Sequence, residues 1–297
     1  MGGPPWLNPE IQRSVAPRDG DIWMAVPAKS GTNWLMNIVH QLLTGGSADF
    51  HSIYDVVAWP EFVERPGQPP QEVLDRIAAM PRDRRRAFKT HQGPPALPFI
   101  EAGSGKDVKY LVAARNPEEA LVSFKLFLEQ HTDAWFDLWK VPRGALTRPD
   151  FAAWYHEVAG PKGLHDLFFR PVAAWWPLRH RKNVLLLHFA DLKRDLAGCT
   201  RKVAQFLGIS PTAAAWPRID EHVSFEWMKR NESKFDTLAN TPVRVLEAGG
   251  MIRRGKMGAS REDGMTDQIA HHLRAVGADI VRDEAALRWM YAGGPVA

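Results

Sequence analysis

The chain has 297 residues, of which 45% are hydrophobic and 24% are charged, so it can bury one large α/β core or two smaller ones. A formal net charge of +4 is too small to indicate a nucleic-acid partner and fits a small anionic ligand equally well. Cys199 is the only cysteine, which excludes an intrachain disulfide framework and suits a reducing compartment. No apolar run reaches the ~18–20 residues of a membrane span, and no signal-sequence pattern opens the chain. We therefore expect a cytoplasmic protein.

Residues 1–20 are rich in proline and glycine and are expected to form an N-terminal arm. After it, the apolar run at 22–26 predicts a strand, and the apolar residues at helical spacing from Trp34 to Leu42 predict a helix. The loop between them offers a lysine, two hydroxyls and a glycine that lets backbone approach a ligand. Because a helix N-terminus also presents unpaired N–H groups and a positive dipole end, this stretch predicts a site for a phosphate or sulfate group.

This loop differs from the ATP-binding pattern Gly-x-x-x-x-Gly-Lys-Ser/Thr. If Lys29 and Ser30 were the Lys-Ser pair of that pattern, its glycines would fall at Trp23 and Ala28. Taken alone, the strand–loop–helix also fits an ordinary turn that carries a surface lysine.

Prolines interrupt residues 45–82, which are expected to form a surface excursion with one short helix around 71–80, either a connector or a substrate lid. A short strand at 87–88 follows, with Lys89, Thr90 and His91 at its end. In open α/β sheets, residues beyond the carboxyl ends of strands face the ligand crevice. His91 is therefore a candidate catalytic residue, although a lone histidine is more often structural.

Residues 108–114 form an apolar run apart from Lys109, which is typical of a parallel strand buried on both faces. Arg115 stands at its end, and Asn116 and Pro117 predict the cap and first residue of a helix. Ser123 lies about two turns further along that helix. The planar guanidinium of Arg115 suits a phosphate, whereas a surface ion pair is the alternative.

The remaining chain adds an aromatic, proline-broken segment at 130–180, which predicts a helical layer and hints at an apolar or aromatic ligand. A strand is expected at 184–187, followed by one helix that ends at Gly208, and one or two helices are expected over 266–293. We thus expect a single α/β domain over residues 1–297, with a central parallel sheet flanked by helices.

The motifs together resemble those of the cytosolic-type sulfotransferases, which use 3′-phosphoadenosine 5′-phosphosulfate (PAPS), and they occur in that family's order from residue 22 to about 260. The stretch AKSGTNWL resembles the family's PKSGTTW loop, and FKTHQ resembles its KTHLP segment. YLVAARNPEEALVS resembles YVARNPKDVAVS, and HVSFEWMKRN resembles TSFKEMKKN. VLLLHFADLK resembles VLYLFYEDMK, and Arg-Arg-Gly in GGMIRRGKMGA matches the family's Arg-Lys-Gly.

The resemblance implies a P-loop-like phosphosulfate-binding loop, in-line sulfuryl transfer with 3′-phosphoadenosine 5′-phosphate (PAP) as product, and no required metal. It implies His91 as catalytic base, with Lys29 and Lys89 as catalytic partners. It implies a mobile cofactor-covering loop at about 245–265. The implied cofactor-binding residues are Lys29, Ser30, Gly31, Thr32, Asn33, Trp34, Arg115, Ser123, Phe189, Phe225, Arg253, Arg254 and Gly255.

Several positions depart from the family pattern. Phe189 replaces a tyrosine, Val223 replaces a threonine, and Gly258 begins Gly-Ala-Ser where the family has Gly-Asp-Trp. The family's dimer motif is not visible, so the oligomeric state stays open. The expected acceptor is a hydroxyl or amine of a small, apolar or aromatic molecule, without nucleic acid or membrane partners. The alternatives are a P-loop nucleotide kinase and a non-catalytic protein that binds PAP or another polyanion.

Overall fold

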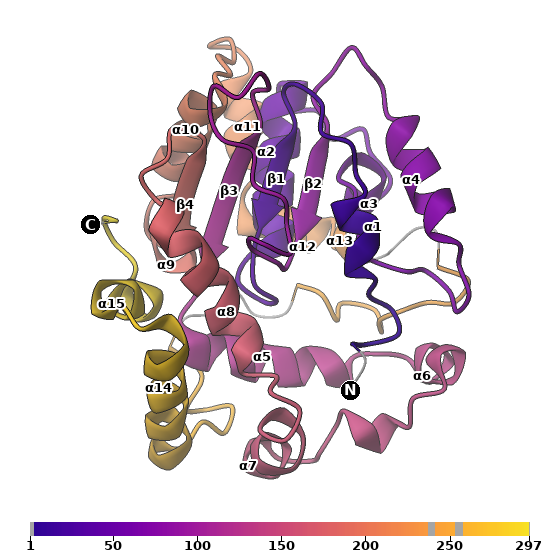
Figure 1. Cartoon of the computed structure of the whole chain (residues 1–297), viewed down its shortest axis with the longest axis vertical. Helices are drawn as coiled ribbons and strands as arrows, with labels where there is room; N and C mark the ends of the chain where they lie inside the picture. The colour runs from indigo at the N-terminus through magenta and orange to yellow at the C-terminus, as the bar shows by residue number, and fades with distance from the viewer. Residues whose placement is uncertain (1–2, 237–240, 253–257, 297) are drawn as a thin grey trace.

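Four parallel strands form the sheet at the centre of the fold, in the order β2-β1-β3-β4 (Figure 1). The structure is a computed structural model that describes residues 3–236, 241–252 and 258–296. The strands are β1 (Ile22–Ala25), β2 (Ala87–Thr90), β3 (Lys109–Ala114) and β4 (Val184–His188). The register pairs Ala25 of β1 with Thr90 on one side and with Val112 on the other. The predicted single α/β domain with a parallel sheet is confirmed.

Both faces of the sheet are buried because helices cover each of them, and successive side chains of a strand point to opposite faces. Trp23 and Val112 pack with α5 (Pro117–Glu129), α8 (Asp166–Trp175), α14 (Asp267–Val281) and α15 (Glu284–Ala292). Met24 and Leu111 pack with α2 (Thr32–Thr44), α10 (Leu196–Leu207) and α11 (Trp216–His222). The two layers of helices hold the four strands in place, and all four carboxyl ends meet at one edge.

Shorter helices complete the chain. The excursion at 45–82 contains the expected helix as α4 (Pro70–Ala78) and also α3 (Ile53–Val56), whose start is fixed by a capping box of Ser52 and Asp55. The others are α1 (Pro9–Arg13), α6 (Asp133–Trp139), α7 (Phe151–Trp154), α9 (Phe189–Arg194), α12 (Phe225–Arg230) and α13 (Ser233–Asp236). The terminal stretch forms two helices, α14 and α15.

One predicted element was wrong. The single helix expected after β4 is two helices, α9 and α10, which meet at Asp195. Asp195 has φ −145° and ψ 78°, outside helical values, and its carboxylate accepts a hydrogen bond from the Gly198 N–H. Its side chain therefore caps α10 and stops α9 from continuing. The predicted end of α10 at Gly208, with φ 67°, is confirmed.

The arrangement of the ends of the strands positions the site. In Figure 1 the strands run downward, and α5 crosses below their carboxyl ends. The N-terminal arm is tied to the excursion at 45–82: Leu7 pairs with Phe62, and the Asn8 N–H donates to the Glu61 carbonyl at 2.7 Å. Within the ranges that the structure describes, no helix is long and apolar enough to cross a membrane.

Candidate active site

The loop between β1 and α2 has a backbone shape that favours glycine at one position. Lys29 and Gly31 both have positive φ, 59° and 96°, and Gly31 is the N-cap of α2 without a side-chain cap. A Cβ at residue 31 would lie 3.1 Å from Cδ2 of Phe189. The loop therefore passes closely over Phe189 and leaves the first N–H groups of α2 available to a ligand.

The side chains of this loop add to an anion site. The Thr32 hydroxyl oxygen is buried and has no hydrogen-bond partner among the residues described. Ser30 is 1% exposed, and Nζ of Lys29 lies 4.3 Å from the centre of the Phe127 ring. The Thr32 hydroxyl can therefore donate a hydrogen bond to a ligand. Together with the uncapped N–H groups and a lysine, it fits a ligand group with several acceptor oxygens.

Asn33 and Trp34 use their polar side-chain atoms within the protein. Nδ2 of Asn33 donates to the Phe235 carbonyl at 3.1 Å, and Nε1 of Trp34 donates to the Val223 carbonyl at 2.8 Å. Oδ1 of Asn33 also accepts from the Tyr54 hydroxyl at 3.3 Å. These side chains anchor the start of α2. Asn33 and Trp34 can therefore contact a ligand through their backbone N–H groups.

The end of β2 brings Lys89 and His91 to the neighbouring strand β1. Nδ1 of His91 lies 2.6 Å from the Val26 carbonyl oxygen, which can only accept, so Nδ1 carries the proton and Nε2 is the basic nitrogen. Nζ of Lys89 lies 3.3 Å from that Nε2. The same Nζ lies 3.3 Å from the centre of the Trp59 ring. A basic imidazole nitrogen and a lysine amine are thus adjacent.

Burial sets the charge state of this pair. The pKa of His91 is lowered to about 3, by desolvation first and then by the charge of Lys89. Desolvation lowers the pKa of Lys89 to about 7, whereas the charge of Glu61 raises it. In the ligand-free protein, His91 is consequently neutral at physiological pH and can accept a proton at Nε2.

Glu61 is a functional candidate that the sequence did not reveal. Its carboxylate accepts hydrogen bonds from the Thr90 hydroxyl at 2.7 Å and from the His91 N–H at 3.1 Å. Desolvation raises the pKa of Glu61, and these hydrogen bonds oppose that rise. The acidic residue stands in a proline-broken stretch whose sequence gave no sign that it folds against β2.

Arg115 lies beside the loop between β1 and α2, as the sequence predicts. Its Nη1 donates to the Lys29 carbonyl at 3.2 Å, and its Nη2 lies 3.0 Å from Oε2 of Glu119. The guanidinium also lies 4.6 Å from the centre of the Phe189 ring. Oε1 of Glu119 accepts from the Gly258 N–H at 2.5 Å, so α5 is linked to the segment after residue 257. Phe189 therefore contacts both Arg115 and the loop at Gly31.

The other predicted site residues are less well defined by contacts with the loop between β1 and α2. Ser123 is partly exposed on α5, and Phe225 is partly exposed with Nζ of Lys193 5.4 Å from its ring centre. Arg253, Arg254 and Gly255 lie outside the described residues. In the expected covering loop, the Val245 carbonyl accepts from the Thr132 N–H and the Glu247 N–H donates to the Gln130 carbonyl. The covering role of residues 245–265 stays a prediction.

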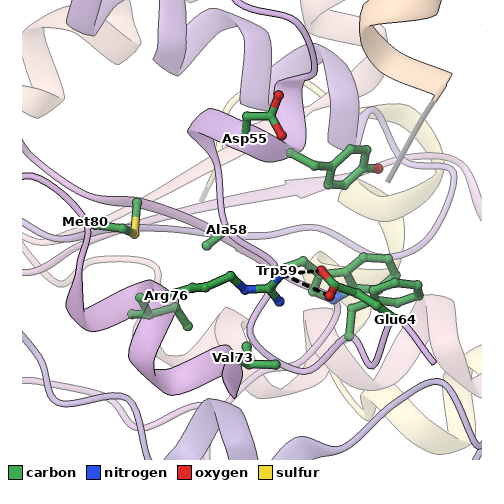
Figure 2. A pocket seen from close by; sticks show the side chains of 10 residues that line it. Asp55, Ala58, Trp59, Glu64, Val73, Arg76 and Met80 are labelled. Carbon is green, nitrogen blue, oxygen red and sulfur yellow. Dashed lines mark hydrogen bonds and ion pairs between the residues drawn. The ribbon is translucent and has the colours of Figure 1, made fainter. Parts of the chain in front are cut away.

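A cavity of about 240 Å³ lies between α3, α4 and residues 58–64 (Figure 2). Figure 2 shows Arg76 reaching across it to Glu64, and Nη1 of Arg76 lies 2.9 Å from that carboxylate. Its lining is aromatic and aliphatic apart from this ion pair and Asp55, and includes Tyr54, Trp59, Phe62, Val73, Ile77 and Met80. Trp59 is shared between this cavity and the Lys89–His91 pair. In the part of the chain that the structure describes, no three His, Cys, Asp or Glu side chains are grouped to hold a metal ion.

Comparisons with known proteins agree with this geometry. Residues 19–283 match the family described as the sulfotransferase domain. Human sulfotransferase 1C2 is 26% identical over 254 residues, which cover 84% of this chain and 79% of the relative. The 3-alpha-hydroxysteroid sulfotransferase of Cavia porcellus is 27% identical over 260 residues, or 85% of this chain and 82% of that protein.

The fold is shared with a solved sulfotransferase. Mouse SULT7A1, solved in complex with PAP, superposes with a TM-score of 0.67 at 20% identity, covering 95% of this chain and 90% of that chain. Because the family match spans most of the chain, from before β1 to the end of α14, the protein belongs to the sulfotransferase domain family.

Proposed function

We propose that this sulfotransferase moves the sulfuryl group of PAPS to a hydroxyl of a small apolar acceptor, with His91 as the general base. The observation that carries the proposal is the adjacency of two features. The uncapped start of α2, with the unpartnered Thr32 hydroxyl, follows β1, and the Lys89–His91 pair ends the neighbouring β2. An anion site and a base thus share one edge of the sheet.

The donor site uses residues whose chemistry fits a nucleotide with two anionic ends. Lys29, Thr32 and the backbone N–H groups after Gly31 would hold the 5′ end, and Arg115 with Ser123 would hold the 3′-phosphate. When bound, PAPS supplies the activated sulfuryl group. The PAP in the SULT7A1 complex supports this assignment, and the family match disfavours a nucleotide kinase.

His91 takes the proton of the acceptor hydroxyl at Nε2. The Val26 carbonyl holds Nδ1 as the protonated nitrogen, so the imidazole presents its lone pair without a change of tautomer. Lys89 lies against the same nitrogen and has to turn away from it before the acceptor can approach. Lys29 and Lys89 then place positive charge where negative charge develops on the leaving phosphate.

The acceptor we propose is an alcohol or phenol on an apolar framework. Trp59 lies next to both catalytic side chains, with its ring centre 5.3 Å from that of His91. A flat aromatic wall at this place favours an apolar molecule over a long acidic sugar chain. The Cavia porcellus relative, named for a 3-alpha-hydroxysteroid, supports an acceptor of that kind.

Transfer of radiolabel from PAPS tests the proposal. A panel would contain a hydroxysteroid, a simple phenol, a long-chain alcohol and an acidic oligosaccharide. We expect labelled product with one of the apolar acceptors, and a kcat about 10²–10⁴-fold lower in His91→Ala, since a positioned general base contributes that much. His180→Ala, at an exposed histidine, is the control and should keep full activity.

Two results would contradict the proposal. Binding of PAP without transfer to any acceptor would favour the non-catalytic alternative. Unchanged turnover in His91→Ala would show that another group takes the proton.

A further inference from the structure

Four arginines gather around an open cavity at the end of the sheet where β1 and β2 begin. This arginine cavity has a volume of about 220 Å³, and it is lined by Arg18, Arg82, Arg84 and Arg86 together with two aspartates and a proline. Arg86 directly precedes β2, whereas His91 follows the end of that strand. The length of a four-residue strand, roughly 13 Å, therefore separates the arginine cavity from the candidate active site.

Two of the four arginines are held in place by the fold. Arg18 donates from Nη1 to the Met80 carbonyl at 3.0 Å and from Nη2 to the Ala78 carbonyl at 2.6 Å, which ties the N-terminal arm to the end of α4. Arg86 donates from Nε and Nη2 to the two carboxylate oxygens of Asp21. These contacts fix two guanidinium groups before a ligand arrives, so little side-chain entropy is lost when one binds.

The other two arginines are exposed and have no partner in the part of the chain that the structure describes. Arg82 and Arg84 form no hydrogen bond or ion pair there, including with Asp83 between them. The carboxylates of the cavity are already engaged, because Asp21 binds as described above and Oδ1 of Asp19 accepts a backbone N–H at 2.7 Å. Four guanidinium groups and two carboxylates leave an excess of two positive charges, which a bound anion would neutralise.

We propose that the arginine cavity is a second anion site, distinct from the donor site, that binds a small anion with phosphate or sulfate groups and at least two negative charges. A planar guanidinium can donate two parallel hydrogen bonds to the oxygens of such a group. The volume of the cavity far exceeds the ~10–15 Å³ that one water molecule needs, so a group of several heavy atoms fits.

Calorimetric titration with inorganic pyrophosphate tests the proposal, at fixed ionic strength and with the donor site filled by PAP. We expect one pyrophosphate to bind per native chain. In a double variant, Arg82→Gln with Arg84→Gln, its affinity should fall at least about tenfold, because hydrogen bonds between charged groups are among the stronger ones. Since neither side chain makes a contact within the described ranges, this variant should keep the native melting temperature.

A second double variant, Lys162→Gln with Lys182→Gln, is the matched control. It removes the same charge at two exposed positions outside the lining of the cavity, so it should bind pyrophosphate as the native chain does. Equal weakening in the two double variants would show that pyrophosphate responds to net charge alone, and would overturn the proposal. Failure of pyrophosphate to bind the native chain with PAP present would overturn it as well.

A parallel titration with inorganic sulfate separates the two kinds of ligand group. Binding of pyrophosphate alone would assign the cavity to linked phosphate groups, whereas equally tight binding of sulfate would assign it to a single dianionic group. Binding of neither would contradict the proposal.

Amide NMR of the native protein locates the ligand without any substitution. With PAP present, pyrophosphate should move the amide resonances of residues 18–21 and 81–86, since these segments carry the arginines. Changes confined to residues 29–34 would place the pyrophosphate at the donor loop and contradict a second site.

The result does not depend on the proposed sulfuryl transfer. A protein that binds no PAP would refute the donor assignment. Loss of pyrophosphate binding in the Arg82→Gln, Arg84→Gln variant, with the lysine variant unchanged, would still support the arginine cavity.

Discussion

Nζ of Lys89 lies 3.3 Å from Nε2 of His91, the nitrogen that we expect to receive the acceptor proton. In the ligand-free protein the lone pair of His91 Nε2 therefore interacts with the Lys89 amine. Because His91 has a pKa lowered to about 3 by burial and by Lys89, it is also a weak base in this state. Negative charge bound beside Lys29 and Lys89 would offset these cations and raise the pKa of His91, so base strength should follow donor binding.

Removing Lys89 tests this relationship directly. The positive charge of Lys89 lowers the pKa of His91, so Lys89→Met should raise it. The measurement is a histidine NMR titration of ligand-free protein. The His91 midpoint should move up from about 3, while kcat falls because the leaving phosphate loses a cation. An unmoved midpoint would show that burial alone controls the base.

Substitution of Gly31 should damage the donor site more than the fold. Gly31→Ala adds a Cβ 3.1 Å from Phe189 at a φ of 96°, and it shifts the loop that presents the first N–H groups of α2. Gly45→Ala is the matched control: it has a φ of 64° at the other end of α2, and its Cβ would meet nothing within 4 Å. Both variants should lose about 1 kcal/mol of stability from backbone strain. Calorimetry with PAP should show weaker binding in Gly31→Ala alone. An equal loss of PAP affinity in both variants would contradict this account.

A buried ion pair at the opposite edge of the sheet should be needed for stability rather than activity. Asp21 and Arg86 are 1% and 3% exposed at their side chains, and they meet at 2.6 Å beside the starts of β1 and β2. Asp21→Asn leaves the Arg86 guanidinium without its charge partner, which typically costs about 3–5 kcal/mol. Asp220→Asn, at the exposed pair with Arg201, should cost at most about 1 kcal/mol. Urea unfolding measures both, and similar losses would be the contrary result.

The parallel sheet and the donor loop could be predicted because their signals are local. The strand at 22–26, the helix from Trp34 and Arg115 after a third strand each depend on neighbouring residues, and parallel strands bring their ends together. The expected adjacency of Lys29, Thr32 and Arg115 follows from that rule, and the Arg115–Lys29 hydrogen bond agrees with it.

Other features depend on contacts between distant segments. Glu61 stands thirty positions before His91, and nothing in its own stretch shows that it folds against β2. The break at Asp195 was missed because the apolar spacing continues through it, and its cause is a side-chain cap that competes with the helix. Glu119 could be placed in the first turn of a helix from sequence, but its pairing with Arg115 and with the Gly258 N–H needed the fold.

The donor site is tested most directly by the melting temperature with PAP and, separately, with ATP–Mg²⁺. A ligand at 100 times its dissociation constant adds about 2.7 kcal/mol to the free energy of unfolding. We predict a clear rise with PAP that is weak or absent with ATP–Mg²⁺. In Arg115→Ala the affinity for PAP should fall about 10- to 100-fold, since hydrogen bonds to charged groups contribute about 1.5–3 kcal/mol. Arg201→Ala, at an exposed ion pair, should respond to PAP as the native chain does. A rise with ATP–Mg²⁺ and none with PAP would contradict the assignment of PAPS as the donor.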